Sequence, residues 1–193
     1  MPSAERRLDD SVRRTLLELA ARSVTHGLEH GTPLPVEAAA YPEPLCAPGA
    51  SFVTLRIMGD LRGCIGSLEH RRPLVVDITD NAFAAAFRDP RFAPVRSAEV
   101  SDIDIHIAVL GPAEPLTYAD EADLIDCLRP EIDGLILRAG HRHGTFLPSV
   151  WDALPRPQDF LYHLKRKAGL PGDYWSDDLR VWRYETESFP DDH

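Results

Sequence analysis

The chain has 193 residues, of which 44% are hydrophobic and 27% are charged, proportions typical of a folded protein. Its formal net charge of −10 disfavours general nucleic-acid binding, because a negative surface repels phosphate backbones. No run approaches the ~20 apolar residues of a membrane span. The first letters, MPSAERRLDD, lack the apolar segment of a signal peptide, so we expect a cytoplasmic protein. The three cysteines form no CxxC pair, which argues against a disulfide framework and a structural zinc site.

The N-terminal part predicts one amphipathic helix. Apolar residues recur at helical spacing from Leu8 to Leu19, which predicts a helix over about residues 4–27. Either Gly27 or Gly31 can end it.

The segment after this helix, residues 31–49, is rich in proline. Five prolines within residues 31–49 are too many for a helix or a central strand, so we expect an extended segment across the surface of the domain. Residues 51–66, SFVTLRIMGDLRGCIG, predict a β-hairpin that turns at Gly59-Asp60.

The rest of the chain predicts helices and strands in irregular order. They are a helix over 73–87, a strand over 101–110, an acidic helix over 119–128, two strands around Gly140 within 133–147, a helix over 157–170 and a strand over 178–189. This order lacks the steady strand–helix alternation of a doubly wound sheet. It predicts an α+β fold with a mainly antiparallel sheet and packed helices.

The register of the hairpin decides which side chains lie beside Cys64. A two-residue turn at Gly59-Asp60 places Cys64 on the apolar face, whereas a three-residue loop pairs Ile57 with Leu61. The longer loop gathers the large apolar residues on one face: Val53, Leu55, Ile57, Leu61 and Ile65. We predict this loop, because a slip of one residue turns every side chain to the opposite face. The other face then carries Thr54, Arg56, Arg62 and Cys64.

That polar face can support thiol chemistry. A free thiol has a pKa of ~8.5, and nearby guanidinium groups favour the thiolate. We predict Cys64 as a nucleophile activated by Arg62, with Arg56, Gly63 and Gly66 as ligand-binding residues, because glycine lets another backbone or a ligand approach closely. The alternative is a small buried cysteine whose neighbouring glycines serve a bulge and helix packing.

The strand DIDIHI adds Asp102, Asp104 and His106 on one face. Successive same-face positions are about 6–7 Å apart, which is wide for a single ion, so we predict no metal site. We interpret the acids as partners of Arg56 or Arg62. Because such pairing would orient the arginines around the thiol, Asp104 is a candidate ligand-binding residue.

A second segment, GHRHGTFLP, adds His143 as a candidate base and Thr145 as a candidate ligand-binding residue. The alternative for this segment is an exposed hairpin turn. The sequence contains no Walker loop, dinucleotide-binding glycine motif, GxSxG elbow or HExxH site, and we predict no cofactor.

The hexapeptide LRGCIG and the letters after it, LRGCIGSLE, resemble the signature of the AMMECR domain family, also called AmmeMemoRadiSam system protein A. Further blocks resemble the family in its order: DPRFAPV, DIDIHIAVLGP, DGLILRAGHRHGTFLPSVW and FLYHLKRKAGLPGDYW. The resemblance implies a single AMMECR domain over 1–193 with two intertwined parts, which we place at about 1–130 and 131–193. It also implies two partners, a Memo-like protein and a radical SAM protein, but no established reaction.

Two functional hypotheses follow. The first is a thiol-dependent enzyme, or catalytic subunit, that uses Cys64 on a substrate with an anionic or carbonyl group. The second is a non-catalytic binding or adaptor component that presents the same cleft to a small anionic ligand or a partner protein.

Overall fold

The computed structural model describes residues 8–189, which divide into two compact units. Unit 1 contains the chain up to Leu110 and its C-terminal residues from Glu187 onward, and unit 2 contains the chain between them, Gly111–Thr186. The chain therefore leaves unit 1 once and returns to it. Each unit has its own hydrophobic core.

The boundary between the units differs from the sequence-based placement near residue 130. Residues 111–130 belong to unit 2, because β6 (Glu114–Pro115) pairs with β9 (Arg180–Tyr184). The predicted last strand over 178–189 is in fact two strands, β9 in unit 2 and β10 (Thr186–Phe189) in the sheet of unit 1.

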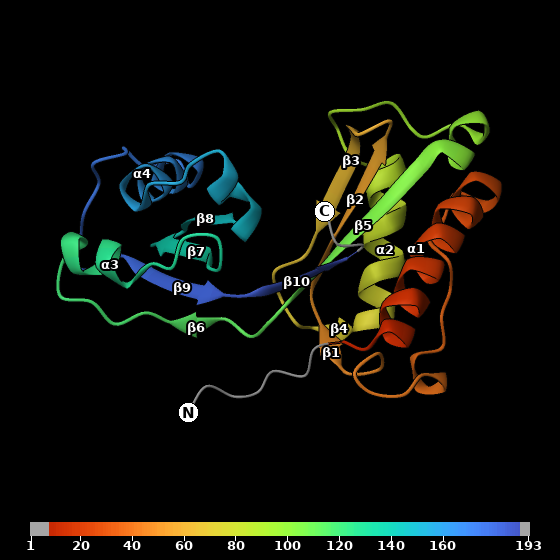
Figure 1. Ribbon diagram of the computed structural model, residues 1–193, viewed down its shortest axis with the longest axis horizontal. Helices are drawn as coiled ribbons and strands as arrows, with labels where there is room; N and C mark the ends of the chain where they lie inside the picture. The colour runs from red at the N-terminus through yellow and green to blue at the C-terminus, as the bar shows by residue number, and fades with distance from the viewer. Residues whose placement is uncertain (1–7, 190–193) are drawn as a thin grey trace. The chain divides into compact units, whose positions relative to one another are not determined.

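Unit 1 is a four-stranded sheet with two helices packed on one face (Figure 1). The strand order is β10-β5-β2-β3, and β2 pairs antiparallel with both of its neighbours. These strands are β2 (Ser51–Ile57), β3 (Asp60–Gly66), β5 (Ile103–Leu110) and the C-terminal β10, and the two helices are α1 (Asp10–His30) and α2 (Leu74–Phe87). The core lies between the helices and the apolar face of the sheet, and includes Leu16, Val53, Leu55, Ile78 and Ile107.

The first helix is longer at its C-terminal end than the sequence predicted. The side chain of Asp9 caps its N-terminus by accepting a hydrogen bond from the backbone of Val12, and residues 4–7 of the predicted helix lie outside the described part of the chain. Gly31, with a φ of 70°, ends the helix. Gly27 lies inside the helix, which continues to His30. A Cβ at Gly27 would come within 2.4 Å of the Phe87 ring of α2, so glycine allows the two helices to pack closely here. Gly27 is therefore a packing residue.

Short elements occupy the loops of unit 1. The proline-rich segment contains a 3-10 turn at Ala38–Ala40 and β1 (Pro48–Gly49), which pairs with β4 (Arg72–Pro73). A second 3-10 segment, Ser97–Asp102, precedes β5, so Asp102 lies before the strand in which it was predicted.

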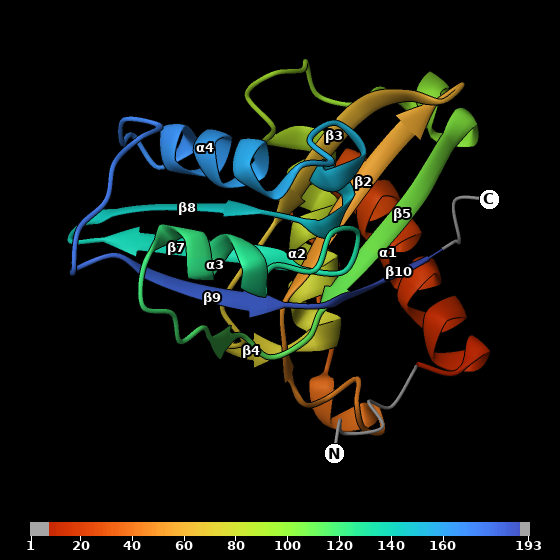
Figure 2. The same cartoon turned by 60° about the vertical axis from the view of Figure 1, so that its left-hand side comes forward.

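Unit 2 is a smaller α+β unit in which two helices share a core with a four-stranded sheet (Figure 2). The strand order is β6-β9-β7-β8, and the remaining elements are α3 (Glu121–Cys127), β7 (Gly134–Ala139), β8 (Arg142–Phe146), a 3-10 turn (Pro148–Asp152) and α4 (Pro157–Lys167). In its core the rings of Trp151 and Phe160 are stacked with centroids 3.8 Å apart.

The predicted fold class is confirmed: the structure combines helices with antiparallel sheets. The predicted strands around Gly140 are β7 and β8, and the three predicted internal helices are α2, α3 and α4. Among the described residues, no helix has the length and apolar character needed to cross a membrane.

Candidate functional site

The hairpin that carries LRGCIG turns on two residues, and the predicted three-residue loop is wrong. Met58 and Gly59 have φ values of 53° and 86°, and Ile57 pairs directly with Asp60. Two consecutive residues with positive φ are typical of a type I′ turn, which matches the twist of the strands. The register then shifts at a β-bulge, where Arg62 is the extra residue in β3.

The bulge restores the pairing that the longer loop had predicted for the rest of the strand. Cys64 lies opposite Thr54, so the two side chains share a face of the sheet as expected. Before the bulge, Leu61 pairs with Arg56 and remains 38% exposed. The prediction that all five large apolar residues share one face is therefore wrong for Leu61.

Two side chains from the loop after α2 bind the backbone of Cys64 at the edge of the sheet. Oδ2 of Asp89 accepts the Cys64 N–H at 2.9 Å, and Nη2 of Arg91 donates to the Cys64 carbonyl at 3.3 Å. Arg91 also donates from Nε and Nη2 to the two Asp89 oxygens, at 2.9 and 2.7 Å. We call Asp89 and Arg91 the edge clamp, because they satisfy backbone groups that an edge strand leaves open.

The edge clamp is a buried carboxylate held by a cation. The hydrogen bonds from Arg91 keep the pKa of Asp89 well below its ordinary value, although burial of the carboxyl acts in the opposite direction, and the Cys64 N–H lowers it further. The same pairing raises the pKa of Arg91, and the charge of an ionised Cys64 contributes in the same direction. Asp89 is only 4% exposed, so the ion pair is anchored inside unit 1.

The sulfur of Cys64 lies in a row of polar side chains that crosses three strands. Oγ1 of Thr54 donates a hydrogen bond to Sγ of Cys64 at 3.2 Å. On the other side of Thr54, His106 of β5 is its direct partner in the ladder. Cys64, Thr54 and His106 are all half-buried, and we call them the cross-strand row. In the neighbouring row, Arg56 lies opposite Asp104.

The predicted arginines make their hydrogen bonds elsewhere. Nε and Nη2 of Arg62 donate to the carboxylate of Glu99, at 2.9 and 3.3 Å, and this pairing lowers the pKa of Glu99 to about 2. Nη1 of Arg56 donates to the carbonyl of Gly59 at 2.9 Å. The guanidinium that reaches Cys64 is that of Arg91, and the acid that binds Arg62 is Glu99 instead of one from DIDIHI.

The glycines of LRGCIG permit close packing within the unit. A Cβ at Gly63 would lie 2.1 Å from the carbonyl oxygen of Ala85, so the approach that this glycine allows is made by the backbone of α2. A Cβ at Gly66 would lie 2.3 Å from the ring of Phe52, its partner in the ladder. Both positions therefore agree with the alternative in which the glycines serve a bulge and packing.

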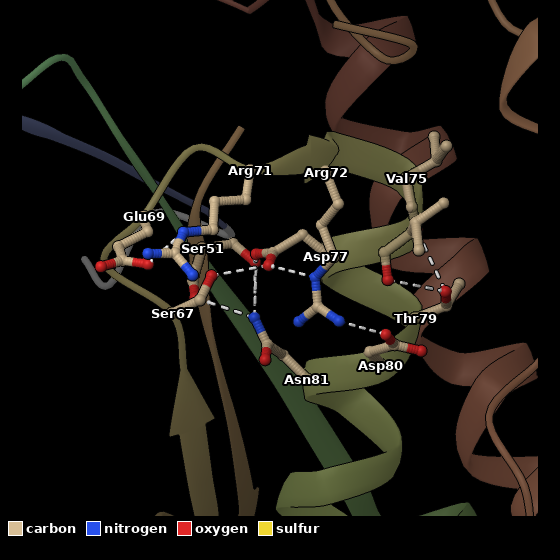
Figure 3. Close-up of polar contacts among 11 residues, drawn as sticks. Ser51, Ser67, Glu69, Arg71, Arg72, Val75, Asp77, Thr79, Asp80 and Asn81 are labelled. Carbon is tan, nitrogen blue, oxygen red and sulfur yellow. Dashed lines mark hydrogen bonds and ion pairs between the residues drawn. The ribbon is translucent and has the colours of Figure 1, made fainter. Parts of the chain in front are cut away.

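A buried polar cluster fixes the end of the hexapeptide strand to α2 (Figure 3). Its centre is the carboxylate of Asp77, which is fully buried and accepts hydrogen bonds from Ser51, Ser67, Arg72 and Asn81 at 2.6 to 3.0 Å. Ser67 directly follows LRGCIG. The Asp77 cluster thus holds one end of this strand, and the edge clamp holds its middle.

The two candidates from GHRHGTFLP belong to unit 2, whereas Cys64 belongs to unit 1. His143 is exposed and lies opposite Arg138 in the β7–β8 ladder. Oγ1 of Thr145 donates to the carbonyl of Leu135 at 2.8 Å and lies 3.2 Å from the hydroxyl of Tyr184. Burial raises the pKa of Tyr184 to about 12. A role for His143 or Thr145 beside Cys64 stays a prediction.

Sequence reasoning did not assign a role to Asp89, Arg91 or Asp77. The block DPRFAPV contained a signal for the first two, because it follows the second helix and resembles a family block. Asp77 lies within a predicted helix, where a charged residue is ordinary. Among residues 8–189, no three His, Cys, Asp or Glu side chains are grouped so as to hold a metal ion.

Comparison with known proteins identifies the family. The model of the AMMECR1 family matches residues 17–189, which is most of the chain. The chain belongs to the AMMECR1 family. A protein from Methanothermobacter thermautotrophicus is 42% identical over 147 residues, which cover 73% of this chain and 74% of that protein. A protein from Methanopyrus kandleri is 35% identical over 186 residues, which cover 92% and 87%.

A solved structure of a relative has the same fold. The crystal structure of the uncharacterized protein PH0010 from Pyrococcus horikoshii matches with a TM-score of 0.84 at 30% sequence identity. The match covers 94% of this chain and 92% of that one. The α+β arrangement described above is therefore shared with that protein.

Proposed function

We propose that this AMMECR1-family protein is a thiol-dependent enzyme, or the thiol-bearing subunit of one, with Cys64 as its reactive group. The observation that carries this proposal is the hydrogen bond from the Thr54 hydroxyl to Sγ of Cys64. A hydroxyl that donates to sulfur stabilises the thiolate, which is the nucleophilic form of cysteine. The edge clamp supports the proposal, because it holds the backbone that carries this thiol.

The charges beside the thiol favour an anionic substrate. The side chain of Arg91 is 53% exposed although its inner face binds Asp89, so the guanidinium can contact both the buried carboxylate and an anion from solution. Guanidinium groups bind carboxylates and phosphates with paired hydrogen bonds. The substrate class that fits Cys64 and Arg91 together is a small molecule with an anionic group next to an electrophilic carbon.

One observation favours the second candidate function, a non-catalytic binding or adaptor component. The N–H of Cys64 is bound by Asp89, so it does not supply a donor for an oxyanion. In this function the half-exposed Arg91 would bind an anionic ligand or an acidic partner while the thiol only contacts it. The partners that family resemblance implies, a Memo-like protein and a radical SAM protein, fit either function, and co-purification with them is the test of that association.

The thiol proposal is tested by alkylation of single-cysteine variants. Cys46, Cys64 and Cys127 are all half-buried and free, so two of them serve as matched controls for the third. Three variants, each retaining one cysteine, are treated with iodoacetamide at pH 7 and followed by intact mass. The expected result is faster modification of Cys64 than of either control. Modification of Cys64 only after unfolding would contradict thiol-dependent activity and leave the binding function.

A further inference from the structure

We propose that His106 is the proton acceptor for the Cys64 thiol and that the Thr54 hydroxyl carries the proton between them. This inference rests on the thiol-dependent function proposed above and names the base that such a function requires. Its basis is the cross-strand row, in which the three side chains occupy directly opposed positions on β3, β2 and β5.

The ladder places the three residues in directly opposed positions on adjacent strands. Thr54 is the direct partner of Cys64 in β3 and of His106 in β5. Side chains of directly opposed residues share a face and have Cβ atoms about 4.5–5.5 Å apart. The first half of the relay is already formed, since Oγ1 of Thr54 lies 3.2 Å from Sγ of Cys64. For the second half, His106 is the residue directly opposite Thr54 on the other neighbouring strand, and we assign the proton to its imidazole.

The chemistry of a hydroxyl allows both contacts at once. A threonine hydroxyl has one hydrogen to donate and two lone pairs that accept. The observed donation from Thr54 to sulfur therefore leaves its oxygen free to accept an N–H from a protonated His106. That arrangement is a thiolate and an imidazolium joined through one hydroxyl, which is the charge-separated state that cysteine–histidine activation requires.

The proton-transfer step is balanced without a further reactant. The S–H bond of Cys64 breaks as the Thr54 oxygen takes that proton, and the Thr54 O–H bond breaks as its own proton passes to a ring nitrogen of His106. The electron pair of the S–H bond stays on sulfur. The net change is one proton moved from sulfur to imidazole, with the threonine regenerated.

The charged groups around the row do not replace His106 as a base. Asp104 lies two residues before His106 on the same face of β5, opposite Arg56, so a negative and a positive charge occupy the neighbouring row together. On the side of Cys64, Asp89 is bound by Arg91 and accepts the Cys64 N–H, and the guanidinium of Arg62 is bound by Glu99.

The remaining neighbour of β5 is β10, whose charged residue Glu187 binds Arg13 of α1. This contact turns Glu187 toward the helix-covered face of the sheet. By strand alternation, Thr186 and Ser188 lie on the face of His106. Among residues 8–189, the strands β2, β3, β5 and β10 thus bring no second imidazole to the row.

The test is the pH profile of Cys64 alkylation in a protein in which Cys46 and Cys127 are replaced by serine. The profile is measured between pH 5 and 9 with iodoacetamide for the parent, His106→Gln and Thr54→Val, and folding of each is checked by circular dichroism. Both substitutions are expected to lower the rate at pH 7 by about tenfold, because the profile loses the contribution of the base and its midpoint moves upward by about one pH unit.

Two controls make the outcome specific. Thr54→Ser keeps the hydroxyl and is expected to retain the parent profile, which a purely structural role for the threonine methyl would not predict. His143→Gln removes the other candidate base and is expected to leave the profile unchanged. An unchanged profile in His106→Gln, or a shifted one in His143→Gln, would overturn the relay while Cys64 remains reactive. An inert Cys64 in the folded parent would instead overturn the proposed function itself.

Discussion

Asp89 accepts the backbone N–H of Cys64 at 2.9 Å across a sequence separation of 25 residues. This contact joins the loop after α2 to the edge strand that carries LRGCIG. Because Arg91 binds the same carboxylate and the carbonyl of Cys64, the backbone of the thiol residue is held on both sides. The edge clamp thus links the segments DPRFAPV and LRGCIG through hydrogen bonds to the backbone of Cys64.

We expect Asp89→Asn to destabilise the protein by about 2 kcal/mol, because hydrogen bonds to buried charged groups contribute about 1.5–3 kcal/mol. The substitution keeps the shape of the side chain and removes the charge that Arg91 binds. Urea denaturation followed by circular dichroism measures the loss. Asp102→Asn, at an exposed position of the same unit, is the control and should change stability by less than about 0.5 kcal/mol. Equal stability of the two variants would show that the edge clamp does not stabilise the fold.

The arginine-bound carboxylates of Asp89 and Glu99 predict that the protein loses stability in acid. The folded-state pKa of Asp89 lies well below its ordinary value, and that of Glu99 is lowered from 4.5 to about 2. A carboxyl with a depressed folded-state pKa stabilises the protein fully above its unfolded pKa and loses this contribution as pH falls through the folded value. The urea midpoint should therefore decline from about pH 4.5 downward.

The corresponding variants test this assignment. In Asp89→Asn and Glu99→Gln the groups no longer titrate, so each variant should show a shallower decline of the urea midpoint between pH 5 and 2 than the parent does. A decline as steep as that of the parent in both variants would place the acid sensitivity in other carboxyls.

The two glycines of the hexapeptide predict unequal effects of substitution. A Cβ at Gly63 meets the backbone of α2 at Ala85, which cannot move without shifting the helix, whereas a Cβ at Gly66 meets the side chain of Phe52 from Cγ outward, which can swing away about its Cα–Cβ bond without moving a helix. We expect Gly63→Ala to cost about 3 kcal/mol or to prevent folding, and Gly66→Ala to cost about 1 kcal/mol. Thermal unfolding of both variants gives the comparison. A greater loss in Gly66→Ala would contradict the packing of α2 on β3.

The turn of the hairpin predicts a stabilising substitution. Met58 has a φ of 53° and is 93% exposed, so it adopts a backbone conformation that is unfavourable for methionine and makes few contacts. Asparagine tolerates this conformation and is preferred before glycine in type I′ turns. Met58→Asn should raise the unfolding free energy by about 0.5–1 kcal/mol. Met58→Ala keeps the unfavourable conformation and should leave the unfolding free energy unchanged. An equal gain in unfolding free energy from alanine would contradict this explanation.

The sequence predicted the elements well because their patterns are local. The spacing of apolar residues identified the helices, and alternation identified β5 and the hairpin strands. The Thr54–Cys64 pairing was also predicted correctly, although for an incorrect turn. The reason is that a two-residue turn followed by a one-residue bulge gives the same register as a three-residue loop.

The contacts of the site were harder to predict, since they depend on tertiary placement. Nothing in the spacing of Asp89 and Cys64 indicates that a carboxylate after one helix binds an amide in an earlier strand. Arg62 was the nearest arginine in sequence, yet its partner is Glu99, and Arg91 contacts Cys64 instead. Gly27 resembled a helix end because its packing against α2 is not visible in a local pattern.

The measurement that tests the central claim most directly compares an anionic and a neutral alkylating reagent at each cysteine. Iodoacetate and iodoacetamide carry the same reacting group, so the ratio of their rates reports the charge around the thiol. The net charge of −10 should disfavour iodoacetate at Cys46 and Cys127. If Cys64 is a reactive thiol beside Arg91, its ratio should be several-fold higher than at these controls and should fall in Arg91→Gln. A ratio at Cys64 no higher than at the controls would contradict a thiol site for anionic substrates.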